Sequence, residues 1–491
     1  MSQGKRMRTE DTATSKKGRK DNKALDTFFK LIAFAYVVIT IIFYIAILKL
    51  NLLPGWVITI FTIAEIVFTL AMVIGLVKRH KTYKLTIISL IIILFVSGIY
   101  IYVTNYALAT ISFLGDVFQE TKETDEYYLI VRKDSSYAKI EDIENKNIHF
   151  FQVADDVKSE LTKKVRVTLV NQENLLDLGN KLIDKNVDVI LTSATQYSML
   201  GDEIKNFKES TKILYTIKHE IQTSTKTAET GSKYSVKSGK FNVYITGIDT
   251  TGSISNVARS DANILMTVNT NTHEALLTSI PRDYYVTLHS YGAKDKLTHS
   301  GIYGVNETVK TVEDLLDTDI NYYVRVNFTT VIKLVDKLGG IDVYSDYDFS
   351  RDGYNFKKGY NHINGNAALV FSRERYSFAE GDNQRVKNQQ HVIEAVMKKV
   401  LNSTTLLTKY TSILDSLKGS FQTNIDQEDI SKLVKDQINN MSSWTIKSNS
   451  LTGTGASSST YSMGSTKLYV MVPNSTSVTS AKEKIDEVLG E

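Results

Sequence analysis

Three long apolar segments near the N-terminus constrain this chain more than any other feature of its sequence. Residues 31–48 contain no charge, residues 56–77 are apolar except for Glu65, and residues 85–115 are again free of charges. A helix needs about 20 apolar residues to cross roughly 30 Å of hydrocarbon, and in lipid only helices and closed barrels satisfy their own backbone. A signal peptide or a buried core helix would explain one such segment, but not three in close succession. The sequence therefore predicts three transmembrane helices within residues 31–104.

Lysine and arginine are distributed unevenly around these segments, and this distribution predicts the orientation. Residues 1–30 carry nine Lys and Arg against four acidic residues, and the connection 78–84 carries four more. The connection 49–55 carries a single Lys. Because positively charged connections stay in the cytoplasm, residues 1–30 are predicted to be a basic cytoplasmic tail and residues 105–491 to lie outside. We therefore expect a multi-pass protein of the cell membrane with a cytoplasmic N-terminus and a large extracellular part.

The modest net charge of +4 combines two ends of opposite charge. Residues 1–104 hold fourteen Lys and Arg and five Asp and Glu, so the exported remainder carries a net charge of −5. An acidic exported part has no general attraction for nucleic acid. The basic tail is interpreted as a topogenic segment that faces lipid, with a DNA-binding arm as the alternative. Glu65 is either a functional group inside the membrane or a hydrogen-bond partner of a neighbouring helix.

The exported part divides at a Ser/Thr/Lys/Gly-rich segment, residues 221–240, which is interpreted as a linker. Before it, residues 105–220 are predicted to form an extracytoplasmic accessory domain of strands and helices. Its strands are expected at 127–131, 148–153 and 187–191, and a helix at 174–184. The pattern weakly resembles the ligand domains of extracellular solute-binding proteins and contains no catalytic group, so binding or spacing is the expected role.

Residues 241–491 show a clearer alternation of strands and helices. Strands are predicted at 241–248, 262–268, 275–280 and 322–327, and helices at 307–316, 330–338 and 383–401, the last with Asp382 as its N-cap. This order is typical of an α/β fold with a mostly parallel sheet and helices on both faces. Ligands of such sheets bind beyond the carboxyl ends of strands, where Asp249 follows the first strand.

Short blocks that combine Arg or Lys with Asp recur along this second section. They are GIDT (247–250), ARSD (258–261), IPRD (280–283), KDKLTHSG (294–301), FSRERY (371–376) and GDNQRVKNQQ (381–390). Arg binds phosphate through two parallel hydrogen bonds, and carboxylates beside phosphates suit Mg²⁺. Cysteine is absent, which excludes thiol nucleophiles and Cys-type zinc sites, and neither a Gly-x-Ser-x-Gly motif nor a Walker A loop occurs. The blocks therefore predict pyrophosphate binding and phosphoryl transfer, in which positioning and charge neutralisation dominate.

Two spacings within these blocks predict shared faces. Arg385 and Gln389 lie four residues apart on the predicted helix and should share one side of it. Arg373 and Arg375 point the same way only if the chain is extended between them.

In this order the blocks, together with NYYVRVNF and LGGIDVY, resemble the LytR-CpsA-Psr family of cell-envelope proteins over residues 241–491. The three-helix anchor and the additional section before this region are similar to the capsule-locus CpsA type within that family. The resemblance implies a phosphotransferase of a Gram-positive-type cell. Such an enzyme moves a polyprenyl-pyrophosphate-linked glycopolymer, here capsular polysaccharide, onto peptidoglycan. Its implied partners are that polymer, peptidoglycan, the lipid bilayer and capsule-assembly membrane proteins, and its implied cofactor is Mg²⁺.

The resemblance also implies roles for individual residues of this sequence. Asp249 and Asp261 would hold Mg²⁺. The pyrophosphate would be contacted by Arg259, Arg282, Arg373, Arg375 and Gln389, with Arg385 and Asp382 in support. Of these residues, catalysis would depend most on Arg282, Arg373, Arg375 and Asp261. Lys294, Asp295 and Lys296 would lie at the rim, with Lys296 as a substrate contact, and an apolar pocket between sheet and helices would take the prenyl chain. This sequence has Asn388 where many members have Arg, which leaves the charge of the site open.

Two alternatives to polymer transfer remain at this point. One is a membrane-bound regulator that attenuates transcription of capsule genes and binds DNA through the basic tail. The other is hydrolysis of the pyrophosphate in place of its transfer to an acceptor.

Overall fold

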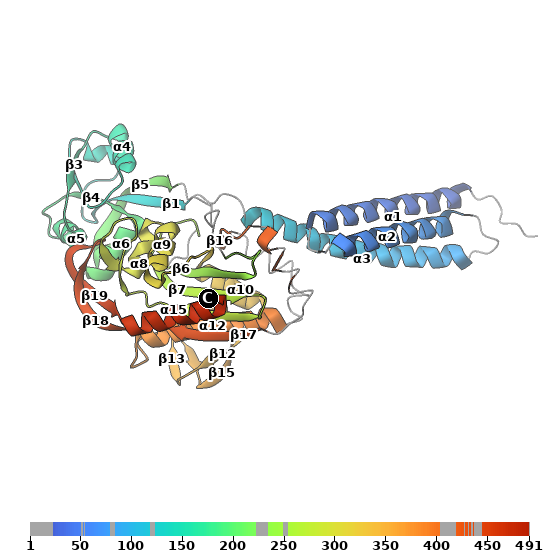
Figure 1. Cartoon of the computed structure of the whole chain (residues 1–491). Helices are drawn as coiled ribbons and strands as arrows, with labels where there is room; N and C mark the ends of the chain where they lie inside the picture. Colours follow the sequence, from blue (N-terminus) through green and yellow to red (C-terminus); the bar gives the residue numbers. More distant parts are fainter. Residues whose placement is uncertain are drawn as a thin grey trace, which may run out of the picture. The chain divides into compact units, whose positions relative to one another are not determined.

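The computed structural model describes residues 23–50, 53, 55–78, 84–117, 123–221, 234–248, 254–402, 419–426, 428–430, 432–433, 436 and 444–490 (Figure 1). The chain separates into two compact units, Met1–Ile111 and Ser112–Glu491.

The first unit is built on three long helices. These are α1 (Lys23–Leu50), α2 (Gly55–Val77) and α3 (Lys84–Val117), of which α3 continues into the second unit. Each contains a stretch long and apolar enough to cross a membrane, and many of the large apolar side chains of these stretches are exposed on the helix surfaces. Exposed apolar side chains of this density are suited to lipid rather than water. The three predicted spans are therefore confirmed as candidate membrane-spanning helices.

Glu65 on α2 is buried against the helices of this unit. The hydroxyl of Tyr100 on α3 donates a hydrogen bond of 2.6 Å to its Oε2, and the hydroxyl of Thr69 donates one of 3.0 Å to its Oε1. The hydrogen bond from Tyr100 thus joins α3 to α2, and Thr69 on α2 itself satisfies the other oxygen of the carboxyl group. Of the two readings of Glu65, the hydrogen bond to a neighbouring helix is the one that the structure shows.

The second unit begins with a five-stranded sheet, which we call the accessory section (residues 123–221). Its strand order is β3-β2-β4-β1-β5, with both parallel and antiparallel neighbours. The strands are β1 (Glu123–Arg132), β2 (Asn147–Phe150), β3 (Thr168–Asn171), β4 (Val189–Ser193) and β5 (Thr211–Ile221). The helices are α4 (Asp155–Lys164), α5 (Leu175–Ile183), α6 (Ala194–Glu203) and α7 (Phe207–Ser210). The predicted helix at 174–184 corresponds to α5, with Asn174 as its N-cap.

A six-stranded sheet forms the centre of the remaining part. Its order is β16-β11-β6-β7-β8-β17. The strands are β6 (Lys240–Ile248), β7 (Ser260–Asn269), β8 (Glu274–Ser279), β11 (Tyr322–Asn327), β16 (Phe421–Thr423) and β17 (Thr445–Ser450). The mostly parallel sheet predicted from sequence is wrong, because β7 is antiparallel to both of its neighbours and β16 is antiparallel to β11. The connection between β7 and β8, residues 270–273, is too short for the crossover that parallel neighbours require.

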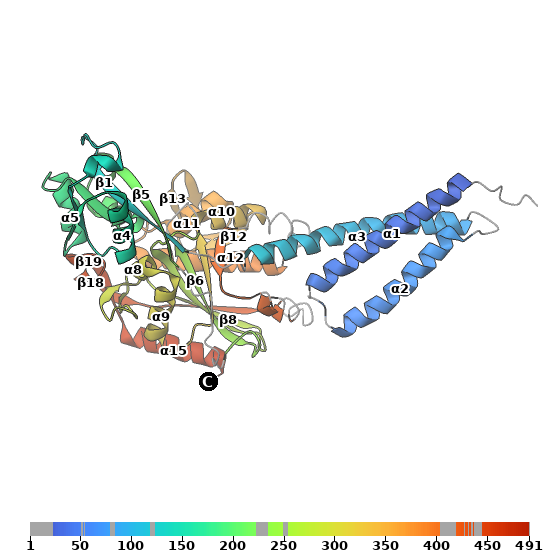
Figure 2. The ribbon, with the colours of Figure 1, turned by 90° about the horizontal axis from the view of Figure 1, so that it is seen from above.

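Helices cover both faces of this sheet, as predicted (Figure 2). Helices α9 (Val305–Leu316) and α15 (Ser475–Leu489) lie on one face, and their apolar side chains share a core with Tyr244, Leu265 and Leu276. The other face carries α10 (Phe328–Lys337), α11 (Gly365–Arg373) and α12 (Asp382–Asn402). Asp382 is the first residue of α12 rather than the residue before it, and its side chain is outside the described part.

The smaller elements form hairpins and turns around these layers. They are β9 (Tyr285–Thr287) with β10 (Lys294–Lys296), β12 (Ile341–Ser345) with β15 (Gly359–Ile363), β13 (Phe349–Arg351) with β14 (Tyr354–Phe356), β18 (Gly453–Thr460) with β19 (Gly464–Pro473), and the short α8 (Leu297–Ser300).

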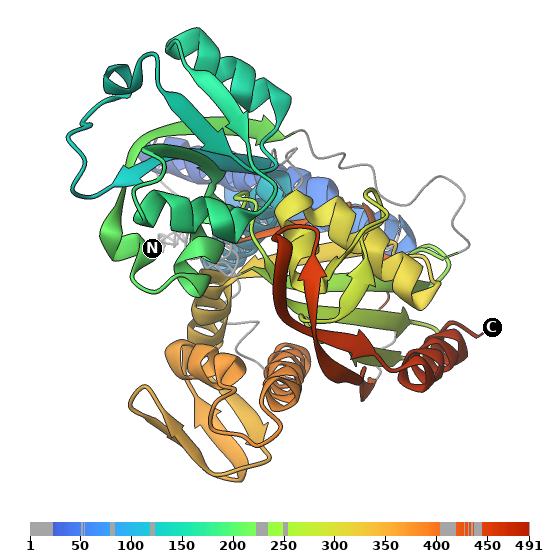
Figure 3. The same cartoon turned by 90° about the vertical axis from the view of Figure 1, so that its left-hand side faces the viewer.

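The hairpin β18–β19 packs against the accessory section, although more than 200 residues separate them in sequence (Figure 3). Met463 and Leu468 from this hairpin complete an apolar core with Leu175, Met199 and Phe207. The side chain of Asn174 also donates hydrogen bonds of 2.9 Å to Ser465 and Thr466. The accessory section and the part that follows it therefore share a core. Most of the predicted linker between them, residues 222–233, lies outside the described residues.

Candidate functional site

One edge of the six-stranded sheet collects the predicted site residues. Strands β6, β8 and β11 run in the same direction, so their C-terminal ends meet there, beside the N-terminal end of the antiparallel β7. Arg259 and Asp261 lie at the start of β7, Arg282 follows β8, and Asn327 ends β11. Blocks far apart in sequence thus reach one place because the strand order brings their ends together.

A cavity of about 1080 Å³ opens at this edge and continues between the sheet and helices α10, α11 and α12. Its interior is apolar. The sheet contributes Ile245, Ile264, Val324 and Val326, and the helices contribute Val331, Leu334, Leu369, Val392, Val396 and Met397. The strand side chains alternate along β6 and β11, so that only those on the α10–α12 face enter the cavity. An elongated apolar ligand would fit this interior.

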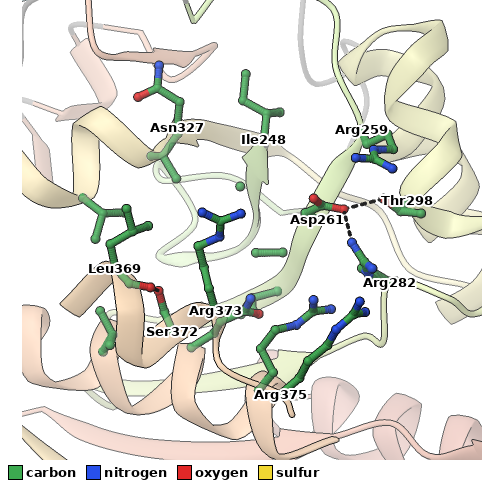
Figure 4. Close-up of a pocket in the computed structure, with 18 of the residues that line it drawn as sticks. Ile248, Arg259, Asp261, Arg282, Thr298, Asn327, Leu369, Ser372, Arg373 and Arg375 are labelled. Carbon is green, nitrogen blue, oxygen red and sulfur yellow. Dashed lines mark hydrogen bonds and ion pairs between the residues drawn. The ribbon is translucent and has the colours of Figure 1, made fainter. Parts of the chain in front are cut away.

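The mouth of the same cavity is strongly basic (Figure 4). It is lined by the predicted substrate residues Arg259, Arg282, Lys296, Arg373, Arg375, Arg385 and Gln389, and by the predicted metal ligand Asp261. Eight of the ten residues predicted from sequence to have a metal-binding, substrate-binding or catalytic role therefore line this cavity. Of the other two, Asp249 lies outside the described residues and the side chain of Asp382 is not described.

Arg373 and Arg375 reach the cavity from the end of α11. The helix ends at Arg373, and Glu374 adopts extended backbone angles of φ −68° and ψ 130°. Glu374 is buried, where it accepts a hydrogen bond from the backbone N–H of Ser377 and pairs with Arg351 at 3.2 Å. Arg373, Glu374 and Arg375 all line the cavity. The chain is extended at Glu374, between the two arginines, as the sequence required for both of them to point the same way.

Helix α12 presents Arg385 and Gln389 to the cavity from one face, as their spacing predicts. Asn388 is fully buried and does not line the cavity. Its amide donates a hydrogen bond of 3.2 Å to the backbone carbonyl of Phe371 and accepts one of 3.0 Å from Gln384. Asn388 thus connects α12 to α11, and the charge of the mouth does not depend on it in this chain.

Asp261 is held by two hydrogen bonds to the same carboxylate oxygen. Arg282 and Thr298 each donate to its Oδ1 at 2.9 Å (Figure 4). Burial alone would raise the pKa of Asp261, but the guanidinium groups of Arg282, Arg259 and Arg385 and the Thr298 hydroxyl lower the pKa to about 2. Asp261 is therefore ionised at every physiological pH.

A second carboxylate, Asp283, supports the same opening. It is buried, pairs with Lys296 at 3.2 Å and approaches Nε of Arg282 at 3.8 Å. The sequence placed Asp283 in a polar block but gave it no role.

Asp261 has the chemistry of a magnesium ligand. Mg²⁺ is usually bound by one or two carboxylates and completes its shell with phosphate oxygens and water, and an ionised carboxylate beside a basic mouth fits this donor set. Among the residues that the structure describes, no three His, Asp or Glu side chains gather closely enough to hold a metal ion. The second predicted ligand, Asp249, is outside that part of the chain.

The other two rim residues named from sequence lie away from the cavity. Lys294 lines a separate cleft, between the accessory section and the β18–β19 hairpin. Asp295 is fully buried, where it pairs with His299 at 2.7 Å and accepts a hydrogen bond from the backbone N–H of Ser462. Asp295 therefore ties α8 to the C-terminal hairpin.

The accessory section contributes residues that the sequence did not predict for the site. Met199, Asp202 and Glu203 at the end of α6 line the cavity, and Asp202 pairs with Arg259 at 2.8 Å. Nothing local in the sequence marks these residues, because they reach the site only through packing between the two sections.

Comparisons with known proteins find related chains over the second part of the sequence. A family model described as the LytR_cpsA_psr family matches residues 203–484. A protein from Enterococcus faecalis named polyisoprenyl-teichoic acid–peptidoglycan teichoic acid transferase TagU is 34% identical over 250 residues, which are 50% of this chain and 81% of that protein. A Bacillus cereus protein of the same name is 36% identical over 204 residues, or 41% of this chain and 66% of that protein. The crystal structure of B. subtilis TagU is 31% identical and covers 51% of this chain and 97% of that chain, with a TM-score of 0.40.

Proposed function

Because the chain belongs to the LytR_cpsA_psr family, we propose that it is a phosphotransferase that moves a polyprenyl-pyrophosphate-linked glycopolymer onto peptidoglycan outside the cell. The names of its relatives support this class of reaction, since they are called transferases of polyisoprenyl-linked teichoic acid to peptidoglycan. We further propose capsular polysaccharide as the polymer, on the resemblance of the three-helix anchor and accessory section to the capsule-locus type.

The observation that carries the proposal is one cavity with an apolar interior and a basic mouth. A polyprenyl pyrophosphate has the complementary shape and charge, with a long hydrocarbon chain that ends in two phosphates. Burial of the chain between the sheet and α10–α12 would be favourable at about 25 cal/mol per Å² of apolar surface. The diphosphate would then lie at the mouth, among the arginines.

The arginines at the mouth support phosphoryl transfer rather than binding alone. In transfer, a P–O bond forms to an acceptor hydroxyl, whose proton passes to water, and the bond from phosphorus to the bridging oxygen breaks. The lipid phosphate leaves with that oxygen and gains negative charge. Arg282, Arg373 and Arg375 line the opening at which this charge would develop, and guanidinium groups bind it in a fixed geometry.

We propose that Asp261, together with Asp249, holds Mg²⁺ at this opening. A bound Mg²⁺ supplies neutralisation of the phosphate oxygens. Arg282 and Thr298 orient the Asp261 carboxylate, and the lowered pKa keeps it in the ionised form that such a ligand requires.

The test is reconstitution of the full chain in detergent micelles with a polyprenyl-pyrophosphate-linked oligosaccharide and purified peptidoglycan. We expect covalent attachment of the oligosaccharide to peptidoglycan and release of polyprenyl monophosphate. Release of a free oligosaccharide phosphate, with none attached to peptidoglycan, would indicate pyrophosphate hydrolysis instead. Absence of both products would contradict the proposal.

A further inference from the structure

The accessory section forms part of the wall of the catalytic cavity. Met199, Asp202 and Glu203 at the C-terminal end of α6 line the same cavity as Arg282 and Arg375. The family match begins at residue 203, so nearly all of the accessory section lies outside it.

Arg259, directly before β7, forms an ion pair with this part of the accessory section. Its Nη1 lies 2.8 Å from Oδ2 of Asp202, and its side chain is only 16% exposed, against 48% for Asp202. Asp202 is the second-to-last residue of α6, and the last turn of a helix favours a nearby cation because its carbonyl groups carry partial negative charge. The carboxylate and the helix end thus favour one position of the guanidinium group.

The backbone that carries Arg259 is also held by the accessory section. The backbone N–H of Thr124 donates to the carbonyl of Ser255 at 2.8 Å, and the N–H of Val257 donates to the carbonyl of Thr124 at 3.1 Å. The hydroxyl of Thr195 on α6 donates to the carbonyl of Val257 at 3.1 Å. Both the main chain before Arg259 and its side chain are therefore fixed by accessory residues.

We propose that Asp202 is a positioning residue, through which the accessory section holds Arg259 in the orientation that contacts the diphosphate. This inference rests on the proposed function. A flexible arginine must lose side-chain freedom when it binds phosphate, and an arginine that is already oriented does not. Asp202 itself adds no attraction for an anionic substrate, because it carries the same sign of charge.

This arrangement predicts a separation between binding and turnover. In Asp202→Asn, removal of a negative charge favours binding of the anionic substrate and the greater freedom of Arg259 opposes it, so we expect KM for the lipid-linked oligosaccharide to stay within about twofold of wild type. The orientation of Arg259 is lost, so we expect kcat to fall about tenfold, since small misplacements of a contacting group lower rates strongly.

The experiment measures kcat and KM of polymer transfer with the full chain in detergent micelles. The variants are Asp202→Asn, Asp202→Glu, which retains the carboxylate, and Asp177→Asn as a matched control. Asp177 lies on α5 of the same section, is exposed to a similar degree as Asp202 (54% against 48%), and pairs with Lys181 away from the cavity. We expect Asp202→Glu to recover most of kcat and Asp177→Asn to match wild type.

Two results would overturn the inference while leaving the proposed function intact. The first is wild-type kcat in Asp202→Asn. The second is a fall in kcat that Asp202→Glu does not recover, together with a lowered Tm in both Asp202 variants. This result would indicate an ion pair that only stabilises the fold. A wild-type chain without transfer activity would instead contradict the proposed function.

Discussion

At the level of single residues, the mouth of the cavity is built from carboxylates that each hold a cation. Asp261 binds Arg282, Asp283 binds Lys296, and Asp202 binds Arg259. These pairs fix the positions of the cationic groups before a substrate arrives. Groups that are already oriented stabilise developing charge without reorganisation at the moment of reaction.

Arg282 contacts both Asp261 and Asp283. It is therefore the residue whose loss should lower the transfer rate most. We expect Arg282→Ala to lower the rate of polymer transfer by about 100-fold or more, the range found when one oriented donor is removed from a reaction centre. The measurement is the initial rate of attachment to peptidoglycan with the purified full chain. Arg166→Ala, on the exposed surface of the accessory section, is the control and should retain the wild-type rate. Full activity in Arg282→Ala would show that the assignment of this residue is wrong.

The lowered pKa of Asp261 predicts how stability depends on pH. Because the pKa is about 2 in the folded chain and near 4 in an unfolded chain, the charged contacts of Asp261 stabilise the fold fully above about pH 4. This stabilisation is lost as the pH falls from 4 toward 2. We expect the difference in Tm between wild type and Asp261→Asn to be constant from pH 8 to pH 5 and to shrink at pH 3. A difference that already shrinks between pH 7 and pH 5 would mean that the pKa is raised instead.

Sequence alone predicted the chemistry of the mouth but not all of its residues. The Arg–Asp blocks could be found because each is a dense local pattern, and the strand order brings most of them to one edge. Asp202 could not be found in this way, since it reaches Arg259 through packing between segments 57 residues apart. Asn388 shows the reverse case, because it lies within a recognised block yet faces away from the cavity.

At the level of elements, the apolar interior depends on the close packing of α10 against α11. Gly365 at the start of α11 lies against the backbone of Ile332, so closely that a Cβ there would come within 2.3 Å of the Ile332 carbonyl oxygen. Glycine is therefore required for α11 to approach α10, and the two helices together form one wall of the cavity.

Filling this interior should separate binding of the lipid chain from binding of the diphosphate. Leu334 on α10 lines the cavity, and Leu334→Trp would occupy space that a prenyl chain needs. We expect this variant to weaken binding of a long polyprenyl diphosphate about tenfold or more and to weaken binding of a short geranyl diphosphate much less. Titration calorimetry with the two diphosphates gives both affinities.

The control for this variant is Lys337→Trp, on the exposed side of the same helix, which should bind both ligands as wild type does. Equal losses for the long and short ligands in Leu334→Trp would argue against a lipid chain in this cavity.

The elements themselves were largely predictable, whereas strand directions were not. The runs at 241–248 and 322–327 correspond to β6 and β11, because a short run rich in β-branched and aromatic side chains marks a strand locally. Direction depends on which strands become neighbours, and this is decided by connections and packing outside each strand. The small hairpins β9–β10 and β18–β19 were also not predicted, since each is too short or too polar to stand out from a loop.

At the level of the whole molecule, the orientation in the membrane remains a prediction from charge. Reporter fusions after residue 30 and after residue 230 test it directly. Because Lys and Arg concentrate before the first helix and between the second and third, we expect alkaline phosphatase to be inactive at residue 30 and active at residue 230. A cytoplasmic reporter active at residue 230 would rule out an enzyme that acts on the outer face.

The alternative of a transcriptional regulator has its own test. Capsule-gene control retained after deletion of residues 5–23 would count against a regulator that binds DNA through its tail.

The core shared by the accessory section and the C-terminal hairpin has a consequence for the timing of folding. A chain is synthesised from its N-terminus, so residues 123–221 are made long before Met463 and Leu468, which complete their apolar core. Gln152 likewise waits for Tyr461, its hydrogen-bond partner 309 residues later. Contacts of such long separation form slowly, so the accessory section stays incomplete until the end of the chain has been made. A shortened C-terminus would therefore show its damage first in the section that is synthesised first.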